Sequence, residues 1–385
     1  MDLIDFASWD PGALAAYAIV ATMALIVLAL VFIFRELGAK PEVTQKASNG
    51  SFGFQRSRGE KVRMEVMQIR QLSADVKNFR LRPLDEYVDY FPGQFLTFHL
   101  GEEEKVPRCY SLNSSPTRPG LYEVAVKRLE GGIGSGWMHD RVAVGDCLSV
   151  SNPSGRFHLR QDADATVLVA GGIGITPMLA ILTYLVDAGA KRPVYFFYCA
   201  RSEADLVFRS ELEDLASRSP QVQFIPVLSR AEESWTGLRG RLSAEIMQAI
   251  GIDFATAELY TCGPSPLMDL AKTIATVGGM PESRFHNEIF ASPASVELEP
   301  RKATIQVEDQ TLAYDGNASL LEFLNDNDVV IPYSCQAGVC GTCEITVTDG
   351  DIESLPSEYL SEDDRKSGRC LSCISFPKSD LKIER

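Results

Sequence analysis

Histidine is scarce in this chain, with only four among 385 residues. These four, His99, His139, His158 and His286, show no Cys-x-His or His-x-x-His pairing. Imidazole-bound metal centres draw on ligands with regular spacing. The scarcity therefore argues against a histidine-ligated iron centre of the kind a terminal oxygenase carries, and we expect the four side chains at the surface or in hydrogen bonds.

Positive charge is also in short supply, because the net charge is −15 and no basic stripe interrupts it. Nucleic-acid binding needs a basic footprint that displaces counterions from phosphates, so the composition excludes a nucleic-acid partner. Nine cysteines in 385 residues are too few for a secreted disulfide scaffold. We expect the soluble part of the chain in a reducing compartment, the cytosol by default.

Charge is absent altogether from Ala13 to Phe34. About 22 residues at roughly 1.5 Å each can just cross a hydrocarbon core of about 30 Å. Acidic residues precede this run and basic ones follow it, namely Asp2, Asp5 and Asp10, then Arg35, Lys40, Lys46, Arg56, Arg58 and Lys61. The sequence predicts a single-pass membrane anchor over residues 1–36, in contact with lipid. Its amino terminus would lie outside and the remainder in the cytoplasm, as in a bacterial inner membrane.

Four cysteines carry the most specific spacing in the chain. Cys335-x4-Cys340-x2-Cys343, followed by Cys373, is the pattern that holds a plant-type 2Fe-2S cluster. Glycines at 338 and 341 allow tight turns that bring backbone N–H groups toward the sulfurs. A zinc site is the alternative, but zinc favours paired C-x2-C knuckles and only one is present. The sequence therefore predicts electron transfer.

The pattern of apolar runs predicts a multidomain protein. After a linker over residues 37–60, residues 61–160 contain short strands bounded by turns, which favour an antiparallel β-barrel. Residues 161–291 alternate apolar runs with helical segments, as in an α/β domain with a parallel sheet. A linker over 292–300 leads to the cysteine-bearing domain, 301–385. The expected strands are Phe95–Leu100, Tyr122–Lys127 and Cys147–Ser151, then Val167–Ala170, Val194–Cys199, Val222–Leu228 and Leu259–Cys262.

A glycine turn joins an apolar strand to a helix in the second domain. Its glycines are Gly171, Gly172 and Gly174, and the helix is expected to open at Thr176 and Pro177. Unpaired N–H groups at a helix start bind phosphate, and glycines let the ligand approach. The spacing departs from Gly-x-Gly-x-x-Gly. A turn that binds nothing is the alternative.

Arg108-Cys109-Tyr110-Ser111 resembles the flavin motif of the ferredoxin-NADP reductase superfamily. The resemblance implies that Arg108 pairs with a flavin phosphate, Tyr110 packs on the isoalloxazine and Ser111 donates a hydrogen bond to its N5. These residue types suit the roles. Taken alone, the tetrapeptide also fits an ordinary barrel strand.

A second flavin element of the superfamily is similar to the stretch that follows. Val126 and Lys127 precede Gly132-x-Gly134-Ser135, whose amides and hydroxyl would meet the cofactor's phosphates, although a hairpin loop is the alternative. Pro153-Ser154-Gly155-Arg156-Phe157 resembles the ending of FAD-binding members, whereas FMN-binding relatives tend to carry Asn at the glycine position. FAD is therefore expected, with FMN as the less favoured flavin. The glycine turn of the second domain matches the superfamily's NAD(P) pyrophosphate loop.

The superfamily's nicotinamide end is similar to Cys262-Gly263-Pro264 and to Glu288 and Phe290. The resemblance implies that Ser111, Cys262 and Glu288 surround the hydride-transfer position, with Gly263 and Pro264 shaping the pocket and Phe290 reaching the flavin. The alternative places Phe290 in the core and leaves Glu288 a solvated charge.

The last 80 or so residues resemble plant-type ferredoxins, which have an α+β β-grasp fold. In that pattern the fourth ligand follows Leu-Ser, which selects Cys373 and leaves Cys370 as a packing thiol. The domain is acidic, with 16 acidic and 8 basic residues from Arg301 to Arg385. Such a surface can steer toward a basic partner, or simply keep the domain soluble.

Together these elements resemble the reductases of bacterial oxygenases. The resemblance implies that NAD(P)H gives a hydride to the flavin, which returns electrons singly to the cluster. The expected acceptor is a terminal oxygenase, hydroxylase or desaturase. A reductase for hybrid-cluster protein, or for another redox protein, is the alternative.

Overall fold

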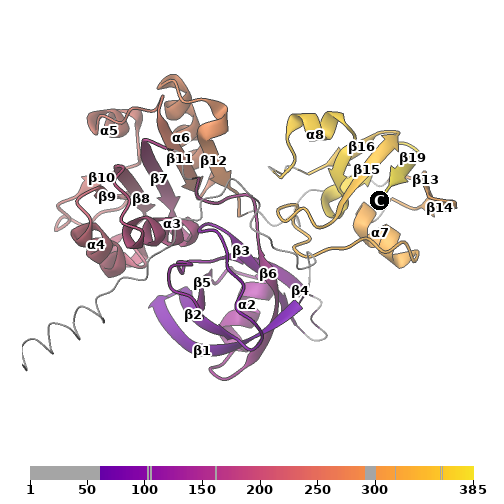
Figure 1. Ribbon diagram of the computed structural model, residues 1–385, viewed down its shortest axis with the longest axis horizontal. Coiled ribbons are helices and arrows are strands. Elements are labelled where there is room, and N and C mark those ends of the chain that lie inside the picture. Colours follow the sequence, from indigo (N-terminus) through magenta and orange to yellow (C-terminus); the bar gives the residue numbers. More distant parts are fainter. Residues whose placement is uncertain are drawn as a thin grey trace, which may run out of the picture. The chain divides into compact units, whose positions relative to one another are not determined.

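The computed structural model describes residues 61–290 and 301–385, apart from 102, 103, 105, 161, 162, 317, 356 and 358 (Figure 1). The expected anchor over 1–36 and both linkers, 37–60 and 292–300, lie outside the described residues. Within the described part, no helix combines the length and apolar character needed to cross a membrane.

The first domain is a six-stranded antiparallel sheet in the order β4-β3-β6-β1-β2-β5. A bridge between Leu112 and Val124 joins the two outer strands and closes the sheet into the expected barrel. Alternating residues of each strand fill the interior, among them Phe79, Phe98 and Val124. The elements are β1 Lys61–Ser73, β2 Val76–Pro83, β3 Phe95–Leu100, β4 Val106–Ser111, β5 Tyr122–Lys127, α2 Ile133–Asp140 and β6 Cys147–Ser154.

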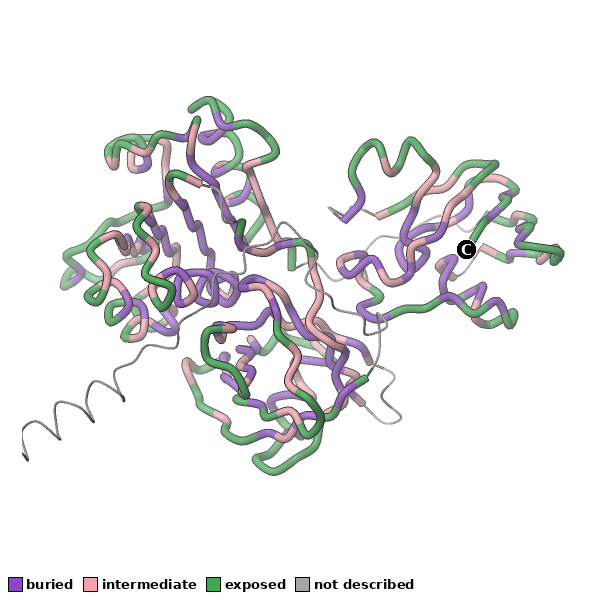
Figure 2. The backbone as a smooth tube through the Cα atoms, in the orientation of Figure 1, coloured by how far each residue is buried: buried purple, intermediate pink, exposed green. Residues whose placement is uncertain are grey.

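The second domain has the expected parallel sheet, in the order β10-β9-β8-β7-β11-β12. Its central strands β7 and β11 are apolar and buried along nearly their whole length, because helices cover the sheet (Figure 2). The elements are β7 Ala165–Gly171, η3 Gly172–Gly174, α3 Ile175–Asp187, β8 Val194–Ala200, η4 Glu203–Asp205, α4 Arg209–Arg218, β9 Val222–Leu228, β10 Leu238–Arg239, α5 Ala244–Ala249, β11 Ala257–Cys262, α6 Ser265–Val277, η5 Glu282–Arg284 and β12 Phe285–Glu288.

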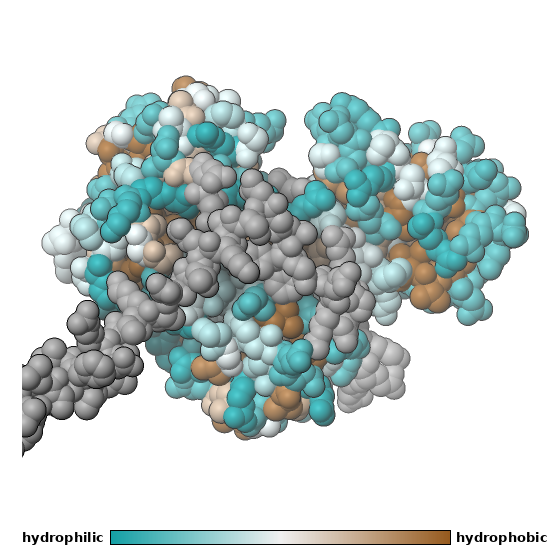
Figure 3. Space-filling model, in the orientation of Figure 1, coloured by the Kyte–Doolittle hydropathy of each residue, from teal (hydrophilic) through white to brown (hydrophobic). Residues whose placement is uncertain are grey.

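The third domain is a mixed five-stranded sheet, β14-β13-β19-β15-β17, with a two-stranded ribbon β16-β18. Leu320, Leu321 and Leu324 of α7 pack into the same core as the strands, in keeping with the expected α+β fold. The elements are β13 Ala303–Val307, β14 Gln310–Tyr314, α7 Leu320–Asp326, β15 Glu344–Asp349, β16 Ile352–Ser354, α8 Glu362–Lys366, β17 Arg369–Leu371, η6 Ser372–Ile374, β18 Ser375–Pro377 and β19 Leu381–Glu384. On the face drawn in Figure 3, hydrophilic residues predominate and hydrophobic ones form smaller patches.

Candidate functional site

Three predicted catalytic side chains meet where the barrel contacts the second domain. Ser111, the last residue of β4, donates a 2.9 Å hydrogen bond from Oγ to Oε2 of Glu288. Cys262 and Glu288 end the neighbouring parallel strands β11 and β12 and are paired in register. The carboxyl ends of parallel strands are the usual ligand edge of such a sheet. The structure thus brings Ser111, Cys262 and Glu288 together.

Burial controls the charge of this site. It raises the pKa of Glu288 to about 8, although the hydrogen bond from Ser111 acts in the opposite direction. Burial also raises the pKa of the Cys262 thiol, and the nearby Glu288 adds to the effect. At neutral pH both groups therefore keep their protons. An uncharged site of this kind suits the passage of hydride between two flat, largely apolar rings.

Two glycine loops face each other at the same edge of the sheet. A Cβ on Gly171 would lie 2.7 Å from Pro264 Cδ, and one on Gly263 would lie 2.9 Å from the Cα of Gly171. A Cβ on Gly174 would lie 2.5 Å from the carbonyl carbon of Cys262. These contacts require glycine, so the predicted pyrophosphate loop and the Cys262-Gly263-Pro264 loop form one closely packed surface.

The helix after the first loop begins earlier than predicted. A 3-10 turn over Gly172–Gly174 leads directly into α3 at Ile175, so Thr176 and Pro177 lie inside the helix. The difference arises because Gly172 adopts a φ of +54°, which starts the turn ahead of the proline. Thr176 is buried, and its Oγ1 donates to Ile173 O at 3.2 Å. Its hydroxyl thus holds the turn whose N–H groups are predicted to receive phosphate.

The flavin residues gather where β4 passes the start of α2. A Cβ on Gly134 would lie 3.2 Å from both Cδ and Nε of Arg108, so the arginine lies across the glycine. Ser135 Oγ accepts from Leu129 N at 3.1 Å and donates to Gly132 O at 3.3 Å. The Gly132 to Ser135 stretch is therefore a helix start and not a hairpin loop. A guanidinium beside such N–H groups fits an anionic phosphate.

The other flavin-motif residues lie on neighbouring strands. Tyr110 packs edge-on against Phe98 with ring centroids 5.4 Å apart, and burial raises the pKa of its hydroxyl. Val126 is fully buried, and its carbonyl oxygen lies 2.9 Å from His139 Nε2. Lys127 Nζ lies 3.2 Å from Asp75. The structure thus engages Val126 and Lys127 with partners on other parts of the barrel.

Phe290 ends the described part of the second domain, and the alternative given for this segment holds for neither of its two residues. Phe290 is 47% exposed, so it is not a core residue. Glu288 is not a solvated charge, because it is hydrogen-bonded to Ser111. The four histidines are hydrogen-bonded, as expected, with Ser151, Val126, Leu159 and Glu258.

The four predicted cluster cysteines are all buried and lie together. Their sulfurs fall into two contacting pairs, Cys335 with Cys340 and Cys343 with Cys373, and Cys335 also contacts Cys373. Among the described residues, no group of three or more His, Cys, Asp or Glu side chains is arranged around a single ion. Four thiols in two pairs are the donor set that two tetrahedral irons require, so these residues fit a 2Fe-2S cluster.

The backbone of the cysteine loop is turned toward the sulfurs. Ala337 N donates to Cys335 Sγ at 3.4 Å, and Thr342 N donates to Cys340 Sγ at 3.5 Å. Gly338 and Gly341 both have a φ of +73°. A Cβ on Gly341 would collide with the Tyr359 ring, and one on Gly338 would lie 2.6 Å from Ile374 Cδ1. The glycines therefore allow the close turns that the sequence predicted.

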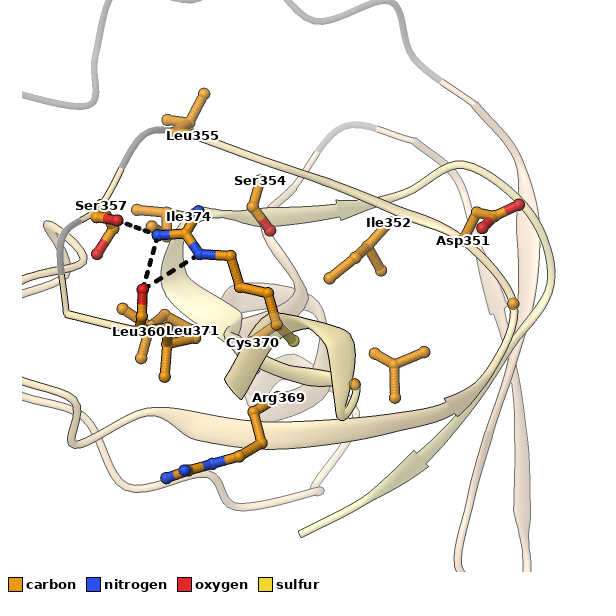
Figure 4. Close-up of a pocket in the computed structure, with 14 residues that line it drawn as sticks. Asp351, Ile352, Ser354, Leu355, Ser357, Leu360, Arg369, Cys370, Leu371 and Ile374 are labelled. Atoms are coloured by element: carbon orange, nitrogen blue, oxygen red, sulfur yellow. Dashed lines mark hydrogen bonds between the residues drawn. The ribbon is translucent and has the colours of Figure 1, made fainter. Parts of the chain in front are cut away.

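Cys370 lies apart from these pairs, at the wall of a cavity of about 340 Å³ in the third domain (Figure 4). Burial raises the pKa of its thiol to about 12. Arg365 also lines the cavity and donates to the carbonyl oxygens of Leu360 and Ser357. The placement agrees with the selection of Cys373 as a ligand candidate and of Cys370 as a packing thiol.

Sequence reasoning missed the residues that join the barrel to the cysteine domain. Arg156 donates to Tyr359 O at 2.7 Å, and its guanidinium lies 4.3 Å from the centroid of the Tyr359 ring. Ser334 Oγ donates to Ser151 Oγ at 3.1 Å. Each pair is separated by more than 180 positions in the sequence. No local pattern could have signalled these contacts.

Comparisons with known proteins match all three domains. Residues 63–159 match the family described as oxidoreductase FAD-binding domain, residues 168–273 the oxidoreductase NAD-binding domain, and residues 303–378 the 2Fe-2S iron-sulfur cluster binding domain. FAD, NAD(P)H and a 2Fe-2S cluster are thus the cofactors.

Two relatives align with most of this chain and with nearly all of their own length. The glycine betaine monooxygenase reductase subunit of Chromohalobacter salexigens is 31% identical, covering 89% of this chain and 98% of the relative. The ferredoxin reductase component of 3-ketosteroid-9-alpha-monooxygenase from Rhodococcus rhodochrous is 32% identical, covering 83% of this chain and 96% of the relative. The solved structure of phthalate dioxygenase reductase has a TM-score of 0.61 at 26% identity, and covers 84% of this chain and 98% of that one.

Proposed function

The chain belongs to the family of NAD(P)H-dependent flavin and 2Fe-2S reductases that serve oxygenase systems, and from this we propose that it supplies one particular oxygenase, hydroxylase or desaturase while tethered to a membrane. When bound, the flavin accepts a hydride and the cluster passes electrons on singly. The chain's own residues bind these groups, orient them and keep the hydride position uncharged.

The contact that carries the proposal is the 2.9 Å hydrogen bond between Ser111 and Glu288. It joins the barrel to the nucleotide domain at the residues predicted to flank the flavin and the nicotinamide. The arginine and glycines at α2 hold the flavin phosphates, and the glycine loop before α3 holds the pyrophosphate. Cys335, Cys340, Cys343 and Cys373 hold the cluster that receives the electrons.

As the electron acceptor we propose an oxygenase rather than the hybrid-cluster protein. Support comes from the relatives, two of which are reductase parts of monooxygenases by name. The acidic third domain would present its charge to a basic patch on that acceptor. Purification of the chain from detergent-solubilised membranes, followed by identification of the bound protein, tests this. Recovery with a non-oxygenase redox protein alone would overturn the choice of acceptor.

The electron path is tested by Cys340→Ser in the full chain. Cytochrome c takes single electrons and should be reduced through the cluster, whereas ferricyanide can take them from the flavin. We expect the variant to lose cytochrome c reduction and to keep ferricyanide reduction. Cys147→Ser is the matched control, because Cys147 is an exposed cysteine of the barrel. Unchanged cytochrome c reduction in Cys340→Ser would refute the path.

The membrane tether rests on the uncharged run from Ala13 to Phe34. We expect the full chain to stay with membranes through salt and carbonate washes and to be released by detergent. A chain lacking residues 1–40 should be soluble and should reduce ferricyanide at the same rate. Release of the full chain by salt alone would rule out a spanning segment.

A further inference from the structure

Strand β4 presents one face to two different domains. Side chains alternate along a strand, so Cys109 and Ser111 lie on the same face, opposite to Arg108 and Tyr110. On the neighbouring strand β3, Thr97 is the partner of Cys109 and Phe95 is the partner of Ser111. Ser111 contacts Glu288 of the nucleotide domain. Cys109, two residues earlier, is therefore only about 7 Å farther along the strand.

Cys109 contacts the cysteine loop of the third domain. Phe95, Cys335 and Cys340 form one buried apolar cluster, and Cys109 packs against it. The Oγ1 of Thr97 lies 3.5 Å from Cys109 Sγ. A cysteine of the barrel thus lies against two of the four predicted cluster ligands.

A row of side chains across three strands fixes this contact. Thr97 is paired with Cys109 on one side and with Ser151 of β6 on the other. Ser151 accepts the 3.1 Å hydrogen bond from Ser334, and both hydroxyls are buried. Ser334 and Cys335 are consecutive, so the two ends of the row hold two successive residues of the cysteine loop. The approach of Cys335 to Cys109 is therefore set by more than one contact.

The proton in this contact belongs to Cys109. Cysteine binds iron as the thiolate, so Cys335 in its role as a ligand has no proton to give and its sulfur can only accept. Cys109 is a free cysteine outside the predicted ligand set and packs against Cys335, so its S–H is the donor.

We propose that Cys109 of the flavin barrel donates an S–H···S hydrogen bond to Cys335 and thereby raises the reduction potential of the cluster. The proposal rests on the proposed function, in which Cys335 is a cluster ligand. Reduction adds one electron, and hence negative charge, to the cluster. A hydrogen bond to a ligand sulfur stabilises that charge. The proton stays on Cys109 throughout and no bond breaks.

The proposal makes the potential depend on how the domains meet. Ala337 N and Thr342 N donate to the sulfurs from within the loop itself, whereas Cys109 donates from another domain. The cluster would therefore be reduced most readily while its domain is docked on the barrel, where the flavin lies. Cys109 would act on the cluster indirectly, through its hydrogen bond to Cys335, and is therefore a positioning residue.

The test is a redox titration of the full, reconstituted chain, with the reduced cluster followed by electron paramagnetic resonance. We expect Cys109→Ala to shift the midpoint to a more negative potential. At the wild-type midpoint, the reduced-to-oxidised ratio should fall about threefold or more, as for loss of one ordinary hydrogen bond. Cys109→Ser keeps a donor and should titrate between the two. Cys147→Ala, which removes an exposed barrel cysteine, should match the wild type.

Flavin absorbance, iron content and ferricyanide reduction show whether each variant is folded and loaded. If Cys109→Ala does not fold, Cys109→Ser and Thr97→Val still test the hydrogen bond. A loaded Cys109→Ala that titrates with the wild type would overturn the inference. Cys335→Ser separates this from failure of the proposed function, because normal iron content and an unchanged spectrum in that variant would overturn the ligand assignment itself.

Discussion

Among substitutions that add a single methyl group, we expect Gly174→Ala to weaken coenzyme binding most. A Cβ added at Gly174 would lie 2.5 Å from the carbonyl carbon of Cys262 and 3.0 Å from the backbone nitrogen of Gly263, whereas ordinary contacts begin at 3.4 Å. The atoms it meets belong to the backbone of Cys262 and Gly263 and cannot rotate away. Gly174→Ala therefore has to move the pyrophosphate loop and the Cys262 loop apart by about 1 Å.

The substitution should lower both stability and activity, because the two loops are the ones predicted to bind the coenzyme. Overpacking of this size in a buried site costs about 1–3 kcal/mol of stability. A displacement of about 1 Å between binding groups can lower a rate by about a hundredfold. We expect kcat/KM for NAD(P)H with ferricyanide to fall about ten- to a hundredfold, and stopped-flow reduction of the flavin to slow in parallel. Flavin and iron contents should stay unchanged.

Gly136→Ala is the matched control. Gly136 lies within α2, and a Cβ there meets no atom within 4 Å. Alanine is the better helix former, so the control should keep full activity and gain up to about 1 kcal/mol. Wild-type kcat/KM in Gly174→Ala, together with an unchanged melting temperature, would refute the close packing of the two loops.

Two further predictions concern the other parts of the site. The pKa of Glu288 is about 8 in the fold against 4.5 ordinarily, so its contribution to stability is complete below pH 4.5 and is lost as the pH rises through 8. Melting temperatures should therefore fall more steeply between about pH 4.5 and pH 8 in the wild type than in Glu288→Gln, and the two curves should run parallel above that range; curves that are parallel throughout would contradict the raised pKa. Gly341→Ala would drive a Cβ into the Tyr359 ring at a φ of +73°, so the purified variant should contain less iron and sulfide while keeping its flavin. Full iron content in that variant would show that the loop can yield.

Local patterns made much of the fold predictable. The runs Phe95–Leu100 and Tyr122–Lys127 are strands with the predicted bounds, because apolar residues end at turn-forming ones. β1 and β12 were not delimited, since charged residues are interspersed in β1 and β12 has only four residues. The glycine turn lies between an apolar strand and a helix, as predicted, but Gly172 starts the helix earlier than the proline suggests.

Contacts between domains were not predictable from local sequence. Cys109 was treated as the variable residue of Arg-x-Tyr-Ser, because nothing near it indicates a partner in the third domain. The same holds for Arg156, whose partner Tyr359 lies 203 positions away. Such pairs depend on how finished domains pack, whereas strand and turn patterns depend on neighbours in the chain.

The two pairs of cluster cysteines occupy different surroundings, and this bears on how electrons enter and leave. Cys335 and Cys340 belong to the apolar cluster shared with Phe95 and Cys109 of the barrel. Cys343 and Cys373 belong to the core of the third domain itself. The irons held by the two pairs would therefore differ in their neighbours, with the first pair nearer the flavin strand.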